Sequence, residues 1–290
     1  HQLNLFTGPL YFIYKIVSCL DLADQLKAKY PGYHFVPLYW MASEDHDFEE
    51  INSTIFNGEV INWNQTAGDA VGRMNLEGLK DAVEKVASKL NPSDHSHRLV
   101  SFLKSDFLEC DHYGEAFLKL VDYLFQDFGL VVLDADSKPL KATFTTAIKN
   151  DLTHQVLEKS VNQSLKALDE LGYKAQVNPR EINLFYFDNN ERKRLIKTND
   201  GFATDDGKSV FTEEEILALV DKHPDRFSPN VLMRPLYQET ILPNLAYIGG
   251  GAELAYWLEL KRYFDEEKMV YPIVFLRNGA MIHNEKQAEK

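Results

Sequence analysis

The chain has 290 residues, of which 44% are hydrophobic and 26% charged, a composition typical of a soluble globular protein that can bury a full core. Its formal net charge of −13 argues against nonspecific nucleic-acid binding, which needs concentrated lysine and arginine. That charge suits a small substrate carrying ammonium groups. No apolar run approaches the roughly 20 residues that a membrane span needs, and no cleavable signal pattern is evident.

In the first half of the chain, helical periodicity alternates with short, continuously apolar runs. Glycine and proline separate these segments and mark their ends. The predicted elements are a helix over 10–30, a buried strand over 34–42, helices over 76–90 and 113–128, a strand over 130–136 and a helix over 154–173.

The second half changes character after residue 178. Two β-rich runs within 182–197 flank an Asp-Asn-Asn turn and predict a hairpin. Thr212 and Glu215 have the spacing of a capping box and predict a helix over 212–220. The remaining predictions are a strand, glycine turn and helix within 245–267, a final strand over 271–278 and the start of a polar helix over 283–290.

This order of elements predicts an α/β fold, with a Rossmann-like parallel sheet covered by helices on both faces. We expect a core over 1–177, a small β-rich connecting insertion over 178–225, and a return to the core over 226–290 that ends in the polar helix. Neither Cys19 nor Cys110 belongs to a metal-ligand spacing or a disulfide framework, so we expect a reduced, cytoplasmic protein.

Four segments follow predicted strands, at the carboxyl edge where a doubly wound sheet binds its ligands. The chain segments are Ser43–Glu50, Asp134–Asp136, Gly249–Gly251 and Arg277–Asn278. Because each follows a different strand, their coincidence predicts a ligand site more strongly than any one of them.

The segment SEDHDFEE, residues 43–50, admits three interpretations, of which two are not catalytic. Acidic residues favour the first turn of a helix, which suits Glu49 and Glu50, and Asp47 with Glu50 has cap spacing. His46 and Glu50 lie four residues apart, on one face of a helix, as metal ligands could. No second histidine stands nearby, so we expect no metal.

The third interpretation is a polar catalytic edge. His46 would accept a proton, and Glu44, Asp45 or Asp47 would bind ammonium groups. Crowded carboxylates perturb one another's pKa values, which is common in active sites.

Two further motifs could bind anions. The turn containing Gly249 and Gly250 offers backbone N–H groups and a helix N-terminus to a phosphate or carboxylate, although it could equally be a tight structural turn. Arg234 lies one helical turn before Gln238 and is suited to bidentate carboxylate binding. The alternative for Arg234 is a salt bridge to Glu239 or to the acidic segment.

The N-terminal segment carries polar candidates as well. His1 and Gln2, followed by Gly8 and a helix, could contact a nucleotide or an acid. Lys15 lies one helical turn from Tyr11, and its alternative is a solvated surface lysine.

Four motifs together resemble one family, the cysteine ligases of bacillithiol biosynthesis. They are HQ-x-x-L-F-x-GPLY-x-x-YK, P-x-YW-x-A-SEDHDF-x-E-IN, SPN-x-L-x-RPLYQ-x-T-x-LPN-x-AY-x-GG and the following E-x-AYW. The resemblance runs through almost the whole chain in the family's order, and the combination of SEDHDFEE with RPLYQ is specific.

The resemblance implies a Rossmann-like core akin to class I aminoacyl-tRNA synthetases, with a connecting insertion and a C-terminal coiled coil that mediates a homodimer. It also implies addition of cysteine to glucosaminyl malate, the last step of bacillithiol biosynthesis. We expect this chain to be an internal piece that lacks the family's N-terminal strand and the coiled coil. ATP is implied as activating donor only by analogy with class I synthetases, because no P-loop is present.

Under this resemblance, the acidic segment binds ammonium groups, and malate carboxylates suit arginine or the glycine turn. The implied substrate-binding residues are Tyr11, Lys15, Arg234, Gln238, Arg277 and Asn278, and the implied cofactor-binding residues are His1, Gln2, Gly8, Gly249, Gly250 and Glu253. Two rival functions are a synthetase-like nucleotide-using enzyme on tRNA or another acid, and a non-catalytic binding module. The net charge argues against tRNA, and the intact motifs argue against a degenerate core.

Overall fold

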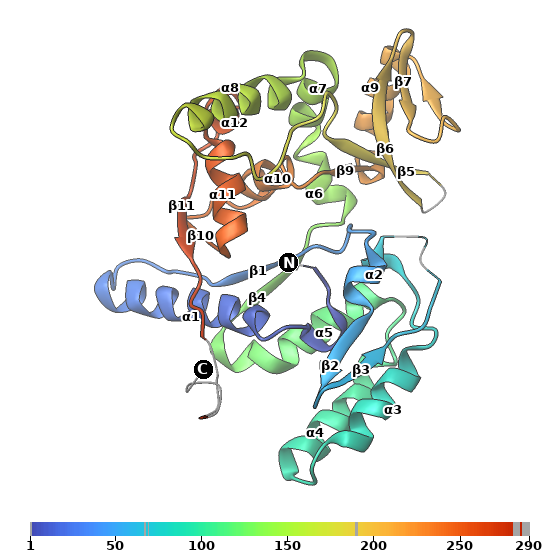
Figure 1. Ribbon diagram of the computed structural model, residues 1–290, viewed down its shortest axis with the longest axis vertical. Coiled ribbons are helices and arrows are strands. Elements are labelled where there is room, and N and C mark those ends of the chain that lie inside the picture. Colours follow the sequence, from blue (N-terminus) through green and yellow to red (C-terminus); the bar gives the residue numbers. More distant parts are fainter. Residues whose placement is uncertain (1, 67, 69, 189–190, 281–284, 286–290) are drawn as a thin grey trace.

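The computed structural model describes residues 2–66, 68, 70–188, 191–280 and 285 (Figure 1). No helix in this described part of the chain is long and apolar enough to cross a membrane. His1, the middle of the predicted hairpin turn at 189–190 and nearly all of the predicted polar helix over 283–290 lie outside the described residues.

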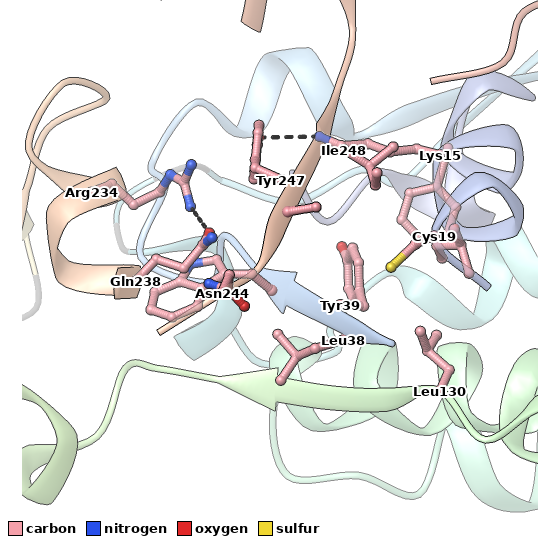
Figure 2. A pocket seen from close by; sticks show the side chains of 14 residues that line it. Lys15, Cys19, Leu38, Tyr39, Leu130, Arg234, Gln238, Asn244, Tyr247 and Ile248 are labelled. Atoms are coloured by element: carbon pink, nitrogen blue, oxygen red, sulfur yellow. Dashed lines mark hydrogen bonds between the residues drawn. The ribbon is translucent and has the colours of Figure 1, made fainter. Parts of the chain in front are cut away.

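Two parallel strand pairs form the centre of the α/β core (Figure 1). Strand β1 (Leu38–Met41) pairs with β4 (Val131–Asp134), and β10 (Ala246–Gly249) pairs with β11 (Ile273–Leu276). The predicted α/β class and parallel pairing are confirmed, and within the described residues the parallel strands form two separate pairs. Side chains of β1, β10 and helix α1 (Tyr11–Lys29) surround a cavity of about 80 Å³ between the two pairs (Figure 2).

The alternation of side chains along β1 buries both of its faces. Tyr39 and Met41 point into one hydrophobic cluster, which includes residues of α1. Trp40 belongs to a second cluster and packs edge-on against Tyr237, with the ring centres 5.4 Å apart. Successive strand residues point to opposite faces, so one short strand joins the two cores.

Helix α1 is buried through its predicted apolar stripe. In α1 the buried residues are Phe12, Ile16, Leu20 and Ala23, which recur at helical spacing. The other helices up to residue 170 are α2 (Phe48–Ile51), α3 (Leu79–Lys89), α4 (Asp94–Phe102), α5 (Tyr113–Phe125), α6 (Lys138–Ala142), α7 (Thr145–His154) and α8 (Val156–Glu170). Short 3-10 turns occur at Leu5–Thr7, Val71–Arg73, Gln126–Phe128 and Pro224–Arg226, and a π-helical turn at Leu103–Phe107.

A small hairpin of β2 (Ser53–Phe56) and β3 (Glu59–Asn62) follows α2. Its turn residues Asn57 and Gly58 have φ values of 50° and 83°. Asn-Gly is the strongest short hairpin signal because both turn positions need positive φ. The β2–β3 hairpin was not predicted, although Asn57 and Gly58 carry this signal.

The β-rich region forms a five-stranded antiparallel sheet in the order β8-β7-β6-β5-β9. The predicted hairpin is confirmed, because β5 pairs antiparallel with β6. The strands are β5 (Leu184–Asp188), β6 (Glu191–Thr198), β7 (Gly201–Thr204), β8 (Val210–Phe211) and β9 (Phe227–Pro229). Helix α9 (Glu213–Lys222) begins at the predicted capping box of Thr212 and Glu215. The domain limits at 178 and 225 stay a prediction.

The chain then returns to the core through α10 (Arg234–Ile241), β10, α11 (Gly251–Glu259), α12 (Lys261–Glu266) and β11. In Figure 1 the antiparallel sheet and the acidic segment after β1 lie on the same side of the β1–β4 pair.

Candidate active site

A cleft of about 760 Å³ lies between the carboxyl ends of β1 and β10 and the β5–β6 hairpin. Both walls are charged. The charged lining residues are Glu44, Asp45, Asp47 and Glu253, and Arg180, Arg192, Arg194 and Arg234. The cleft therefore presents carboxylates and guanidinium groups to one ligand, at the sheet edge where ligands of α/β proteins bind.

The acidic segment after β1 is fixed by the turn at 70–72. The Ser43 carbonyl accepts the Gly72 N–H at 2.8 Å, and the Asp45 carbonyl accepts the Val71 N–H at 2.6 Å. The buried Ser43 hydroxyl donates to Asp134 Oδ1 at the end of β4. Two of the predicted ligand-edge segments thus contact each other directly.

Glu44 is held by an internal ammonium group. It contacts the buried Lys141 Nζ, which also lies 3.0 Å from Asp136 Oδ1. Arg73 binds Asp136 through two hydrogen bonds of 2.7 and 2.8 Å. Burial raises the pKa of Glu44, although Lys141 opposes this shift. Glu44 is already paired with Lys141. The carboxylates of the acidic segment that line the cleft and remain for a substrate ammonium group are therefore Asp45 and Asp47.

Asp47 and the residues after it form the start of α2. Glu49 and Glu50 lie in its exposed first turn, as predicted. The predicted cap is wrong, because the Asp47 side chain makes no capping hydrogen bond and Glu50 instead accepts from Gln2 Nε2 at 2.7 Å. The Asp47 carboxylate is 53% exposed and can therefore meet a ligand.

The cleft also contains an arginine that the sequence analysis overlooked. Arg192 on β6 donates from Nη1 to His46 Nδ1 at 3.1 Å and lies 4.0 Å from Asp45 Oδ1. Arg192 and Arg194 alternate along β6, so both side chains point to the cleft face. The basic run Glu191-Arg-Lys-Arg in a predicted strand was the available signal.

Asp45, His46 and Asp47 could together offer ligand atoms that lie within 4.8 Å of one another. Arg192, however, brings a fixed positive charge to two of these three side chains. Because His46 Nδ1 already accepts a hydrogen bond from Arg192, this ligand atom is not available to a metal ion. The arrangement therefore gives no support to a metal site.

Arg234 points into the cleft from the start of α10. Its Nη1 donates to Gln238 Oε1 at 2.8 Å, and its guanidinium carbon lies 6.0 Å from the rings of Trp40 and Tyr247. The alternative of a salt bridge to Glu239 is wrong, because Glu239 accepts from the backbone and side chain of Asn244. Within the described residues, Arg234 forms no ion pair, so its charge is available to an anionic ligand.

Lys15 and Glu253 join α1 to α11. Lys15 Nζ lies 2.6 and 2.8 Å from the two carboxylate oxygens, and Tyr247 also donates to Glu253 at 2.6 Å (Figure 2 shows Lys15 and Tyr247). The alternative of a solvated Lys15 is wrong. Although burial opposes the shift, Lys15 and the Gly250 N–H lower the pKa of Glu253 to about 2. Because Gly250 N–H donates to Glu253 at 2.8 Å, this donor of the glycine turn is already used.

Five of the six predicted substrate-binding residues are not part of the cleft lining, namely Tyr11, Lys15, Gln238, Arg277 and Asn278. The Arg277 guanidinium carbon lies 5.3 Å from the ring centre of Tyr11, and the Asn278 N–H donates to Ser18 Oγ at 3.0 Å. The backbone of Arg277 continues the contact with β10 by donating to the Gly249 carbonyl. The structure thus brings Arg234 and the acidic segment together in the cleft, and the other five predicted substrate-binding residues lie outside its lining.

The described residues of the implied nucleotide site do not form a phosphate cradle. Gln2 donates to the carboxylates of Asp45 and Glu50, which would repel a phosphate. Gly8 has a φ of 65°, and a Cβ there would lie 2.5 Å from the Asn4 side chain, so it serves the local turn. His1 lies outside the described residues.

Comparison with known proteins gives consistent matches. The family model described as "Bacillithiol biosynthesis BshC, N-terminal Rossmann-like domain" matches residues 1–278. Relatives named "Putative cysteine ligase BshC" are 47% identical over 290 residues in Flavobacterium johnsoniae and 48% over 287 residues in Flavobacterium psychrophilum. These alignments cover 100% and 99% of this chain and 54% of each relative, so the chain spans about half the length of the curated relatives it matches.

Proposed function

The chain belongs to the BshC family of bacillithiol biosynthesis, and on that premise we propose that it carries the substrate site of a ligase joining cysteine to glucosaminyl malate. One observation supports this function most strongly. In a cleft of about 760 Å³, the carboxylates of Asp45 and Asp47 share the space with the guanidinium group of Arg234, which forms no ion pair with another described residue. Both substrates carry an ammonium group and at least one carboxylate.

The carboxylates suit the amine partner. An amine attacks only after losing its extra proton, so the site must bind an ammonium group and then accept a proton from it. Asp45 and Asp47 lie at the exposed end of the acidic segment, beside His46. We propose that Asp45 and Asp47 bind the sugar amine and take up its proton, with His46 beside them.

The guanidinium group suits the malate part. Malate brings two carboxylates, and arginine binds a carboxylate through two parallel hydrogen bonds. Arg234 has Gln238 as its neighbour and faces the same cleft as the acidic segment. We therefore propose that Arg234 binds a malate carboxylate while the amine lies near Asp45 and Asp47.

Amide formation makes a C–N bond at the cysteine carboxyl and breaks a C–O bond there, so the carboxyl must first receive a leaving group. The described residues of the implied nucleotide site form no phosphate cradle, and we assign no step to a nucleotide. The test therefore supplies nucleoside triphosphates as one variable. The protein that carries this chain, at full length, is incubated with cysteine, glucosaminyl malate and each donor, and the thiol product is followed by mass. Formation of the amide supports the proposal, and folded protein that makes none with any donor contradicts it.

Substitution of Arg234 tests the site itself. A charged hydrogen bond contributes about 1.5–3 kcal/mol, so Arg234→Ala should raise the KM for glucosaminyl malate about 10- to 100-fold with an unchanged Tm. Arg226→Ala is the control. Arg226 also stacks on an aromatic ring, that of Tyr186 in the antiparallel sheet, but it does not line the cleft. An unchanged KM in Arg234→Ala, or a loss of Tm alone, would return Arg234 to a structural role.

A further inference from the structure

Arg192 is fixed by contacts that do not involve His46. Its Nε donates to Ser228 Oγ at 3.0 Å, and its Nη2 donates to the Pro229 carbonyl at 3.1 Å. The guanidinium plane lies over the Phe185 ring, with its carbon 3.9 Å from the ring centre. Only 9% of the side chain is exposed. These anchors hold the guanidinium group in place, so the direction of Nη1 towards His46 does not depend on the contact with His46.

The contact between Arg192 and His46 determines the form of the imidazole ring. A guanidinium group can only donate hydrogen bonds, so His46 Nδ1, at 3.1 Å, must be the acceptor. A neutral imidazole carries its single proton on the other nitrogen in that case. His46 thus has its N–H at Nε2.

No hydrogen bond to His46 Nε2 comes from the residues that the structure describes, so Nε2–H is available to a ligand. Asp47 Oδ1 lies 3.9 Å from Nε2, a distance that exceeds hydrogen-bond length. His46 lines the cleft, and its side chain is 41% exposed.

We propose that Arg192 is a positioning residue that keeps His46 in the neutral Nε2–H form, so that His46 donates a hydrogen bond to a carbonyl or carboxylate oxygen in the cleft. This inference rests on the proposed function and deepens it, because it divides the roles within the acidic segment. His46 then stabilises negative charge on the acyl oxygen, as a preorganised donor does. The amine proton goes to Asp45 or Asp47 instead. The insertion supplies Arg192 and is therefore part of the site.

The tautomer can be measured without turnover. Long-range ¹H–¹⁵N correlation spectra of the chain, recorded where the ring is neutral, distinguish a protonated Nε2 from a protonated Nδ1. His46→Gln removes one set of signals and so assigns His46 among the nine histidines. We expect only the Nε2–H form in the wild type and in the matched control Arg226→Ala. In Arg192→Ala the Nδ1–H form should gain population, because Asp45 Oδ1 lies 3.8 Å from Nδ1.

A wild-type His46 with Nδ1–H or with both forms mixed overturns the inference, as does an unchanged spectrum in Arg192→Ala. The wild-type spectrum tests the assignment even if Arg192→Ala does not fold, and Arg192→Lys then serves as the folded comparison. Arg192→Lys should also populate the Nδ1–H form of His46, because lysine lacks the planar fork and the stacking that direct the donor. A ring locked as Nε2–H in Arg192→Lys would contradict the role of the guanidinium group.

Turnover separates a donor from a base. Glutamine places an amide N–H near the position of Nε2–H but cannot accept the amine proton. His46→Gln should therefore stay within about tenfold of wild-type kcat, while His46→Ala should lose about 100-fold, as when one such donor is removed. Equal losses in both variants would contradict the donor role. If the wild type forms no amide, the proposed function fails, whereas the tautomer measurement still decides the role of Arg192.

Discussion

Asp151 is a buried carboxylic acid that supports the rim of the cleft. It is 1% exposed, and it accepts the backbone N–H of Asn183 at 2.7 Å. Asn183 in turn accepts from Asn230 Nδ2 at 2.9 Å, and both asparagines line the cleft. Burial raises the pKa of Asp151 to about 7, more than these hydrogen bonds lower it. A proton on this single side chain therefore couples pH to the stability of the fold.

The sign of that coupling follows from the raised pKa. Between about pH 4 and about pH 7 the folded chain binds a proton at Asp151 that the unfolded chain releases, so the free energy of unfolding falls as pH rises. The fall totals at most about 4 kcal/mol and stops above about pH 7. Asp151→Asn should remove this slope in urea unfolding, while the exposed Asp122→Asn should keep it. A wild-type slope in Asp151→Asn would contradict the prediction.

At the scale of elements, the sequence predicted most where the local pattern decides the structure. The apolar stripe of α1 and the capping box of α9 need only near neighbours, and both were predicted correctly. The pairing of strands depends on distant segments instead. The split between the β1–β4 and β10–β11 pairs therefore could not be predicted from continuous apolar runs, which look the same in one sheet or in two.

The capping box of α9 gives a local stability test. Thr212 Oγ1 accepts the Glu215 N–H at 3.2 Å, and Glu215 accepts the Thr212 N–H at 2.8 Å. Thr212→Ala should lower the free energy of unfolding by about 1 kcal/mol, because orphaned N–H groups lose their acceptor. Thr198 is an exposed residue of β6, and Thr198→Ala should change the free energy of unfolding by less than about 0.5 kcal/mol. Equal values for the two variants would show that the cap contributes nothing.

At the scale of the whole molecule, the site combines predicted and unpredicted parts. The rule that ligands bind at the carboxyl edge of strands pointed to the acidic segment, which lines the cleft, but also to Arg277 and Asn278, which do not. Arg234 was proposed separately, as a carboxylate-binding arginine, and it lines the same cleft. Arg192 meets His46 across 146 positions, and Lys15 meets Glu253 across 238. Those contacts depend on how the insertion and α11 dock on the core, which no local pattern encodes. The acidic segment thus indicated the place of the site, and the structure supplied its partners.

The most direct test of this site is a titration of glucosaminyl malate into the ¹⁵N-labelled chain, followed by backbone chemical shifts. We predict saturable shifts at Asp45–Asp47, Arg192 and Arg234, and none in the β2–β3 hairpin, which lies away from the cleft lining. Arg234→Ala should weaken the response. Saturable shifts elsewhere that spare these residues, or the absence of any saturable shift, would contradict the claim that this cleft binds the ligase substrate.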